Sequence, residues 1–100
     1  MDKLNKYFIY CTDKNPKFPS CDDQENWIIQ MAESQELNIV GSFKDHNSNT
    51  QQFNLLLQAM NKYKAQGIFV WDISLIPNIP LVKKLIRTNK IHVIKPFLDT

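Results

Sequence analysis

The sequence predicts an α/β protein, a single-domain three-layer sandwich in which helices cover both faces of a mainly parallel, four-stranded sheet. Two observations lead to this prediction. Short apolar runs alternate along the chain with longer segments in which apolar residues recur every three or four positions. The segments between them are short, and short strand–helix–strand connections imply right-handed crossovers between parallel strands. The chain has 100 residues, 43% of them hydrophobic, which is enough for one domain with its own core over residues 1–100.

The first half of the chain predicts two strands with a helix between them. Residues 7–11 form a short aromatic and apolar run, which is typical of a buried strand. Ser20 precedes Asp23 by three residues, an arrangement that opens a helix. Three apolar residues follow at helical spacing: Ile28, Met31 and Ala32. Residues 37–43 predict the second strand, and the polar residues 45–49 predict a loop after it.

The second half of the chain repeats this alternation. Thr50 opens a predicted helix, whose apolar stripe consists of Phe53, Leu56, Leu57 and Met60. Residues 67–71 predict the third strand, which is a continuous apolar run. Asn78 is expected to cap a third helix, and residues 92–94 predict the fourth strand. Each predicted helix therefore lies between two predicted strands.

Composition and charge exclude several classes of protein. The net charge of +2 is too small to indicate nucleic acid or a membrane surface as the partner. The chain has no apolar run of about 18 residues and no signal-peptide pattern at its start, so we expect a cytoplasmic protein without a membrane span. Cys11 and Cys21 are expected to be reduced, and His46 and His92 lie far from both in the sequence. The sequence thus predicts no zinc site and no cofactor.

Several segments share the order and spacing of one known family's motifs. Residues 10–14, Tyr-Cys-Thr-Asp-Lys, stand where that family has Tyr-x-Arg-x-Ser, and Gln24 stands at its glutamine. Residues 53–56 are similar to its Arg-Pro-x-(Phe/Leu) helix. Residues 74–78 follow the third strand, where the family has Asp-Arg-Leu-x-Arg. Over nearly its whole length the chain therefore resembles the catalytic domain of the serine recombinases, the resolvase/invertase family.

The resemblance implies a parallel α/β fold and a reaction that uses a serine nucleophile among several arginines. This chain departs from the family at those positions. The residues that occupy them are Thr12, Lys14, Thr50, Ser74, Leu75 and Asn78, with Lys14 in the place of the serine. Arg87 is the single arginine of the sequence, and lysine does not reproduce the forked donors with which a guanidinium group binds phosphate. Of the family's reacting groups only Gln24 is retained.

These departures predict a catalytically inactive domain and not an enzyme. We expect a resolvase-like N-terminal (catalytic-type) domain over residues 1–100, without the family's long dimer helix and DNA-binding domain. It is expected to act as a protein-interaction or regulatory module linked to DNA recombination or mobile elements, through a protein partner or self-association. The segment after the third strand is aliphatic where the family has charged residues, and contains Ile73, Leu75, Ile76 and Ile79. This segment either fills the former cleft with core or forms a contact surface.

Two further functions are open from the residues alone. The one basic cluster consists of Lys83, Lys84, Arg87 and Lys90, to which Lys95 adds a fifth cation. It predicts either weak contacts with DNA phosphates or only the solvated face of an amphipathic helix. The other function is a metal site, because Asp13, Asp45 and Asp72 each lie at or after the end of a predicted strand. Three carboxylates at that edge can hold Mg²⁺ for phosphotransfer, although aspartate is also an ordinary turn residue.

Overall fold

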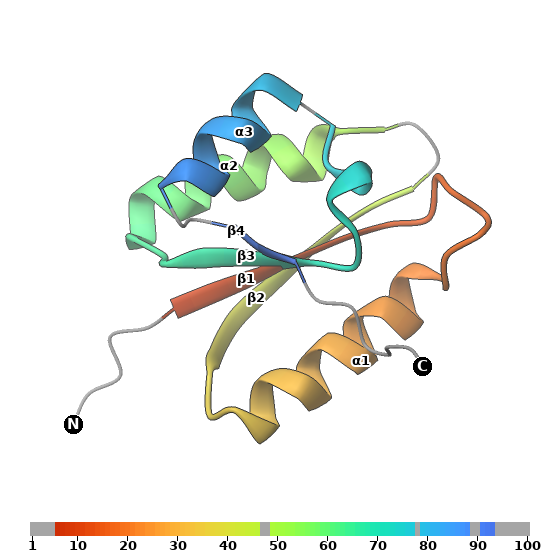
Figure 1. The fold of residues 1–100 in the computed structure, drawn as a ribbon, viewed down its shortest axis with the longest axis horizontal. Helices are drawn as coiled ribbons and strands as arrows, with labels where there is room; N and C mark the ends of the chain where they lie inside the picture. Colours follow the sequence, from red (N-terminus) through yellow and green to blue (C-terminus); the bar gives the residue numbers. More distant parts are fainter. Residues whose placement is uncertain (1–5, 47–48, 78, 89–90, 94–100) are drawn as a thin grey trace.

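A computed structural model describes residues 6–46, 49–77, 79–88 and 91–93. Its strands form one parallel sheet in the order β2-β1-β3-β4. The strands are β1 (Lys6–Thr12), β2 (Asn38–Asp45), β3 (Gly67–Val70) and β4 (Ile91–Val93). Helix α1 (Cys21–Ser34) covers one face of the sheet, and α2 (Gln51–Tyr63) and α3 (Ile79–Arg87) cover the other (Figure 1). The predicted three-layer α/β sandwich with a parallel four-stranded sheet is confirmed.

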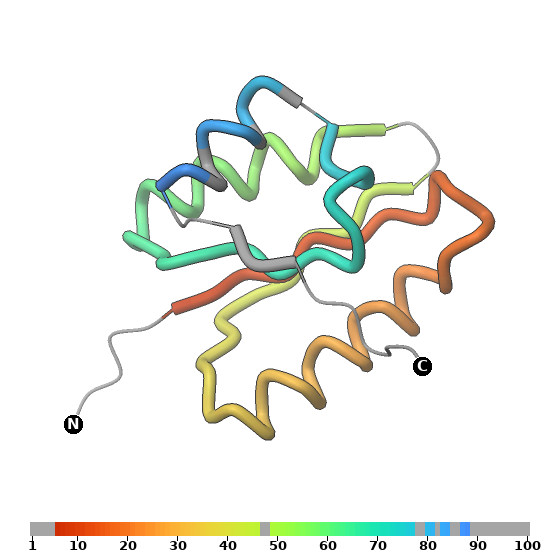
Figure 2. The backbone as a smooth tube through the Cα atoms, viewed as in Figure 1, coloured from red at the N-terminus to blue at the C-terminus, as the bar shows by residue number. Residues whose placement is uncertain are grey.

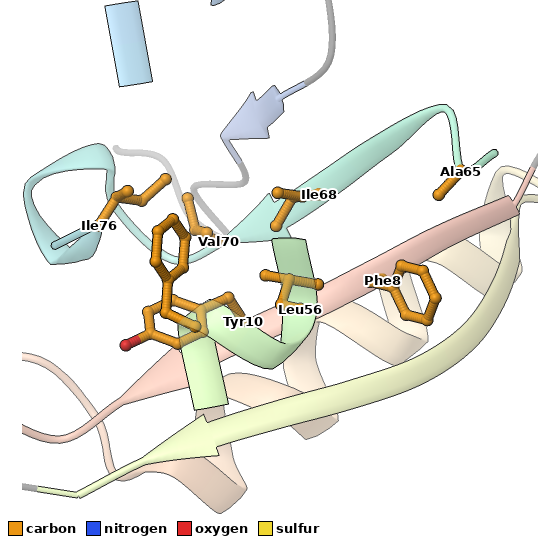
Figure 3. Close-up of a cluster of buried hydrophobic side chains, with 8 residues drawn as sticks. Phe8, Tyr10, Leu56, Ala65, Ile68, Val70 and Ile76 are labelled. Carbon is orange, nitrogen blue, oxygen red and sulfur yellow. The ribbon is translucent and has the colours of Figure 1, made fainter. Parts of the chain in front are cut away.

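The core lies on both faces of β1, because successive side chains of a strand point to opposite faces of its sheet. Phe8 and Tyr10 pack with residues of β3 and α2 in a cluster that Figure 3 shows. Tyr7, Ile9 and Cys11 pack on the other face against α1. Burial on both faces explains why the sequence of β1 reads as a continuous apolar run and not as an alternating one.

The first two helices begin where the sequence predicts, but by different means. Ser20 caps α1 by accepting a hydrogen bond from the backbone N–H of Asp23 at 3.2 Å. Thr50 stands at the cap position of α2, yet its side chain makes no capping bond. The carboxylate of Asp45 accepts from the backbone N–H groups of Gln52 and Phe53 instead. Asp45 is the last residue of β2, whereas the sequence predicted it as the first residue of a loop.

Two aliphatic residues of the segment after β3, Leu75 and Ile76, belong to the core. Leu75 and Ile76 are each 1% exposed, and Ile73 packs against the cluster on the α2 face. The interpretation of Ile73, Leu75, Ile76 and Ile79 as an interface is therefore wrong for the two buried residues, because their side chains are already used inside the domain. Their burial agrees with the alternative, that these aliphatic residues belong to the core. The side chain of Ile79 and the predicted cap Asn78 lie outside the described residues.

No helix in the described part of the chain combines the length and apolar composition that a membrane crossing requires.

Candidate functional site

The ends of the first three strands and the segments after them gather at one edge of the sheet, as the backbone trace in Figure 2 shows. The parallel pairing places Thr12 at the end of β1 beside Asp45 at the end of β2. In open parallel sheets this carboxyl edge is where ligands bind. It is therefore the first place to look for a functional site.

A small hollow of about 180 Å³ lies at this edge. Its lining residues are Tyr10, Thr12, Lys14, Asn49, Thr50 and Pro77. Thr12, Lys14 and Thr50 are three of the positions that the resemblance assigns to reacting residues, and the fold brings them together. Among the described residues that line the hollow, Lys14 is the one cation. Ser74 is exposed on the short helix η1 (Ile73–Leu75) and is not among these residues.

Tyr10, one of the lining residues, belongs to a buried hydrogen-bond network around Asp45. The Asp45 side chain is 2% exposed and accepts from the Tyr10 hydroxyl at 2.8 Å. It also accepts from the backbone N–H groups of Gln52 at 2.8 Å and Phe53 at 3.0 Å. Burial, together with the hydrogen bond to Asp45, raises the pKa of the Tyr10 phenol above its ordinary value. Tyr10 therefore remains a neutral donor, and Asp45 joins β1, β2 and α2.

Gln24, the retained residue of the family pattern, is fully buried on α1. Its amide nitrogen donates to the backbone carbonyl oxygens of Thr12 at 2.9 Å and Pro19 at 2.8 Å. These two bonds hold both ends of the loop that contains Lys14. Its amide oxygen has no hydrogen-bond partner among the described residues. In this chain Gln24 is a positioning residue for that loop.

The three aspartates of the predicted Mg²⁺ site do not share a ligand sphere. Asp45 is engaged in the network above, and Asp72 accepts from the backbone N–H of Ser74 at the start of η1. Asp13 instead lies 2.9 Å from the Nδ1 atom of His46. In the described ranges, the group that could hold a metal consists of Asp13, Cys21 and His46. The three-aspartate interpretation is therefore wrong in its ligand set.

The sequence analysis missed this group because its members are separated along the chain. One signal does point to it. Thr12 and Asp45 are register partners in parallel strands, so the residues that follow them, Asp13 and His46, must also be neighbours. Cys21 joins them as the first residue of α1.

A second missed feature is a pair of ion pairs beside the group. The Lys44 ammonium lies 2.8 Å from Glu25 and 3.0 Å from Asp22, which ties β2 to α1. The hydrogen bond from Lys44 lowers the pKa of Glu25, and the bonds to Glu25 and Asp22 raise the pKa of Lys44.

The basic cluster lies away from the hollow. Lys83, Lys84 and Arg87 are exposed on α3, while Lys90 and Lys95 lie outside the described residues. Because α3 runs back from the carboxyl edge toward the start of β4, its last residue Arg87 lies at the amino edge (Figure 1). There a groove of about 520 Å³ separates the ends of α2 and α3. Its lining residues are Leu57, Met60, Asn61, Lys64, Ala65, Lys84 and Thr88.

Two solved catalytic domains are similar to this structure. The first is the C-terminal catalytic domain of ISC1926 TnpA, an IS607-like serine recombinase, with a TM-score of 0.69 and 16% identity over 94% of this chain and 69% of that chain. The second is the N-terminal catalytic domain of TP901-1 integrase, with a TM-score of 0.69 and 18% identity over 90% of this chain and 75% of that chain. No protein-family model and no curated protein matches the sequence. The likeness establishes the fold, and this chain has the fold of a serine recombinase catalytic domain.

Proposed function

We propose that this chain is a recombinase-fold domain that acts by binding, in a process linked to DNA recombination or a mobile element, and does not cleave DNA. The observation that supports this most is the hollow at the carboxyl edge. It keeps its place in the fold, but Lys14 and two threonines line it where the resembled family has a serine and arginines.

Strand transfer through a protein–phosphate linkage needs two things at this edge. One is an activated hydroxyl, and the other is a set of fixed donors around the five-coordinate phosphate. Thr12 and Thr50 both line the hollow, but Thr12 is 2% exposed, and an amine replaces the hydroxyl at position 14, where the resembled family has its nucleophile. The single arginine, Arg87, ends a helix at the opposite edge of the sheet. One lysine cannot supply the several forked donors that would stabilise the negative charge on the five-coordinate phosphate.

The test is incubation of the full chain with supercoiled plasmid, with separate readouts for nicking and for covalent protein–DNA adducts. We expect neither product above the level of a buffer control. Nicking that disappears in Lys14→Ala or Thr50→Ala protein would overturn the proposal. Nicking that persists in both variants would be assigned to a contaminating nuclease.

The binding surface that we propose consists of Val40 and Tyr63, and the occupant that we propose is a second copy of the chain. These side chains are 44% and 49% exposed, and with Lys6 and Phe8 they line a hollow of about 250 Å³. Val40 lies on the edge strand β2, but it is the extra residue of a bulge and disturbs strand pairing there. Side-chain contact is therefore favoured over addition of a strand.

Charge beside this surface gives self-association a distinctive signature. Lys6 lines the hollow, and the Lys62 ammonium lies 5.4 Å from the centre of the Tyr63 ring. In a symmetric pair these lysines approach their counterparts, so added salt should strengthen the dimer by screening repulsion. Light scattering across concentration and salt measures this. Val40→Lys should give a monomer, and Trp27→Lys on α1 is the matched control. A monomer at every concentration would refute self-association.

The second candidate function is nucleic-acid binding by the basic cluster. It is favoured by one observation, that Lys64 of the α2 end faces the same groove as Lys84 of α3 and adds a cation. Binding of a fluorescent duplex should weaken steeply as salt rises, opposite to the dimer. Combined Lys83→Glu and Arg87→Glu changes should weaken it further, and Lys17→Glu is the control. Equal affinity in the double variant and the parent would reject this candidate.

A further inference from the structure

We propose that Asp13, Cys21 and His46 form a binding site for one Zn²⁺ ion. One ligand atom from each residue lies within 4.8 Å of the other two. The Asp13 Oδ2 and His46 Nδ1 atoms are 2.9 Å apart. A carboxylate, a thiol and an imidazole from three separate elements therefore meet at one point of the carboxyl edge.

The backbone fixes this meeting point. Asp13 and His46 follow the register partners Thr12 and Asp45, so the parallel sheet itself sets their separation. Cys21 is the first residue of α1, and its thiol donates to the backbone carbonyl of Asp45 at 3.6 Å. The Cys21 side chain is therefore held against the end of β2, directly before His46. None of the three positions depends on a long, unsupported loop.

The kind of ligand selects the kind of metal. Thiolate and imidazole suit zinc, whereas Mg²⁺ and Ca²⁺ prefer oxygen ligands alone. Tetrahedral zinc with bonds of about 2.0–2.3 Å separates its ligand atoms by roughly 3.3–3.6 Å. The Asp13 and His46 ligand atoms, which are 2.9 Å apart, must therefore move apart by a few tenths of an ångström.

Burial suits this adjustment. Cys21 is buried, while the His46 side chain is 63% exposed and that of Asp13 is 38% exposed. The two exposed groups can turn toward an ion that enters from solvent. The buried Cys21 sulfur provides the fixed ligand, and the thiol proton that it donates to the Asp45 carbonyl in the free protein is released to solvent when Zn²⁺ binds. Three protein ligands leave one position of a tetrahedral ion for water or for a group of a partner.

This inference does not depend on the function proposed above, because its test involves neither DNA nor self-association. Reduced full-length chain is titrated with Zn²⁺ by calorimetry, and thermal unfolding is measured with and without the ion. We expect one ion per chain. At a hundred times the dissociation constant we expect a rise in Tm of about 10 °C or more.

Variants then assign the ligands. His46→Gln and Asp13→Asn should each weaken Zn²⁺ binding at least about tenfold, whereas the controls His92→Gln and Asp22→Asn should not. Because the two changed side chains are exposed, these variants are expected to fold. No measurable binding, or equal binding in His46→Gln and parent protein, would overturn the site.

Cobalt substitution tests the sulfur ligand directly. Co²⁺ in a tetrahedral site with a thiolate ligand shows strong visible bands and a sulfur-to-metal charge-transfer band. Both should be present in the parent protein and in Cys11→Ala protein, and absent in Cys21→Ser protein. A weak octahedral spectrum in the parent protein would show that Cys21 is not a ligand and would overturn the three-residue site.

Discussion

The Asp45 side chain joins the end of β2, the start of α2 and the Tyr10 hydroxyl, so its removal should be among the most destabilising single changes in the chain. Asp45→Ala deletes three hydrogen bonds of 2.8–3.0 Å and leaves a buried phenol without its acceptor. A helix cap contributes about 1 kcal/mol, and a hydrogen bond to a charged group about 1.5–3 kcal/mol. Because the bonds share one acceptor and are not additive, we expect a loss of about 3–5 kcal/mol in the free energy of unfolding.

Urea unfolding at neutral pH, followed by circular dichroism, measures this loss, and two variants identify its origin. Tyr10→Phe removes one donor and should cost about 1–2 kcal/mol, and the double variant should lose about 1–2 kcal/mol less than the sum. Thr50→Ala is the matched control, because Thr50 occupies the cap position without capping, and it should cost under about 0.5 kcal/mol. The reasoning is refuted if Thr50→Ala costs as much as Asp45→Ala, or if the Tyr10 and Asp45 effects simply add.

Three further changes test other parts of the structure by the same measurement. Glu25→Gln should cost about 0.5–1 kcal/mol at neutral pH. The pKa of Glu25 is lowered from 4.5 in the folded chain, so its contribution is complete above that pH and lost as the pH falls through the folded-state pKa. A cost that persists in acid would show that Lys44 is not the cause. Ile76→Ala should cost about 2–4 kcal/mol because Ile76 is a core residue, and a cost under about 1 kcal/mol would show that its side chain is not packed in the core. Gly41→Ala places a methyl group 3.2 Å from a ring carbon of Phe8 and should cost about 1 kcal/mol, whereas unchanged stability would show that the ring moves freely.

The fold was predictable because its signals are local. The run at residues 7–11 shows a strand buried on both faces, and Ser20 with Asp23 marks the start of α1. The start of α2 was placed correctly at Thr50, but the side chain that caps it was not predicted. Its capping carboxylate comes from Asp45, five residues earlier, at the end of a strand. Local rules assign a cap to the nearest suitable residue, whereas here tertiary structure supplies it.

The candidate site was less predictable because it depends on contacts between distant residues. Asp13 and His46 are 33 positions apart, and only the register of β1 with β2 makes them neighbours. The same register explains why the three-aspartate site fails. Asp45 points into the domain at the last position of its strand, while Asp13 lies one residue beyond the end of β1. A shift of one residue at a strand end separates a buried structural carboxylate from an accessible one.

Helix direction explains part of the charge distribution without any nucleic acid. In a parallel α/β sandwich the helix C-termini lie at the amino edge of the sheet, where their partial negative charge favours cations. Lys62 lies in the last turn of α2, and Lys84 and Arg87 lie in the last turn of α3. Each can therefore stabilise its own helix by about 0.3–1 kcal/mol, which is sufficient reason for a cation there. The helix C-terminus accounts less well for Lys83, because Lys83 lies one position before the last turn of α3. A DNA-binding role is thus best judged by the salt dependence of Lys83→Glu and not by the presence of the cluster.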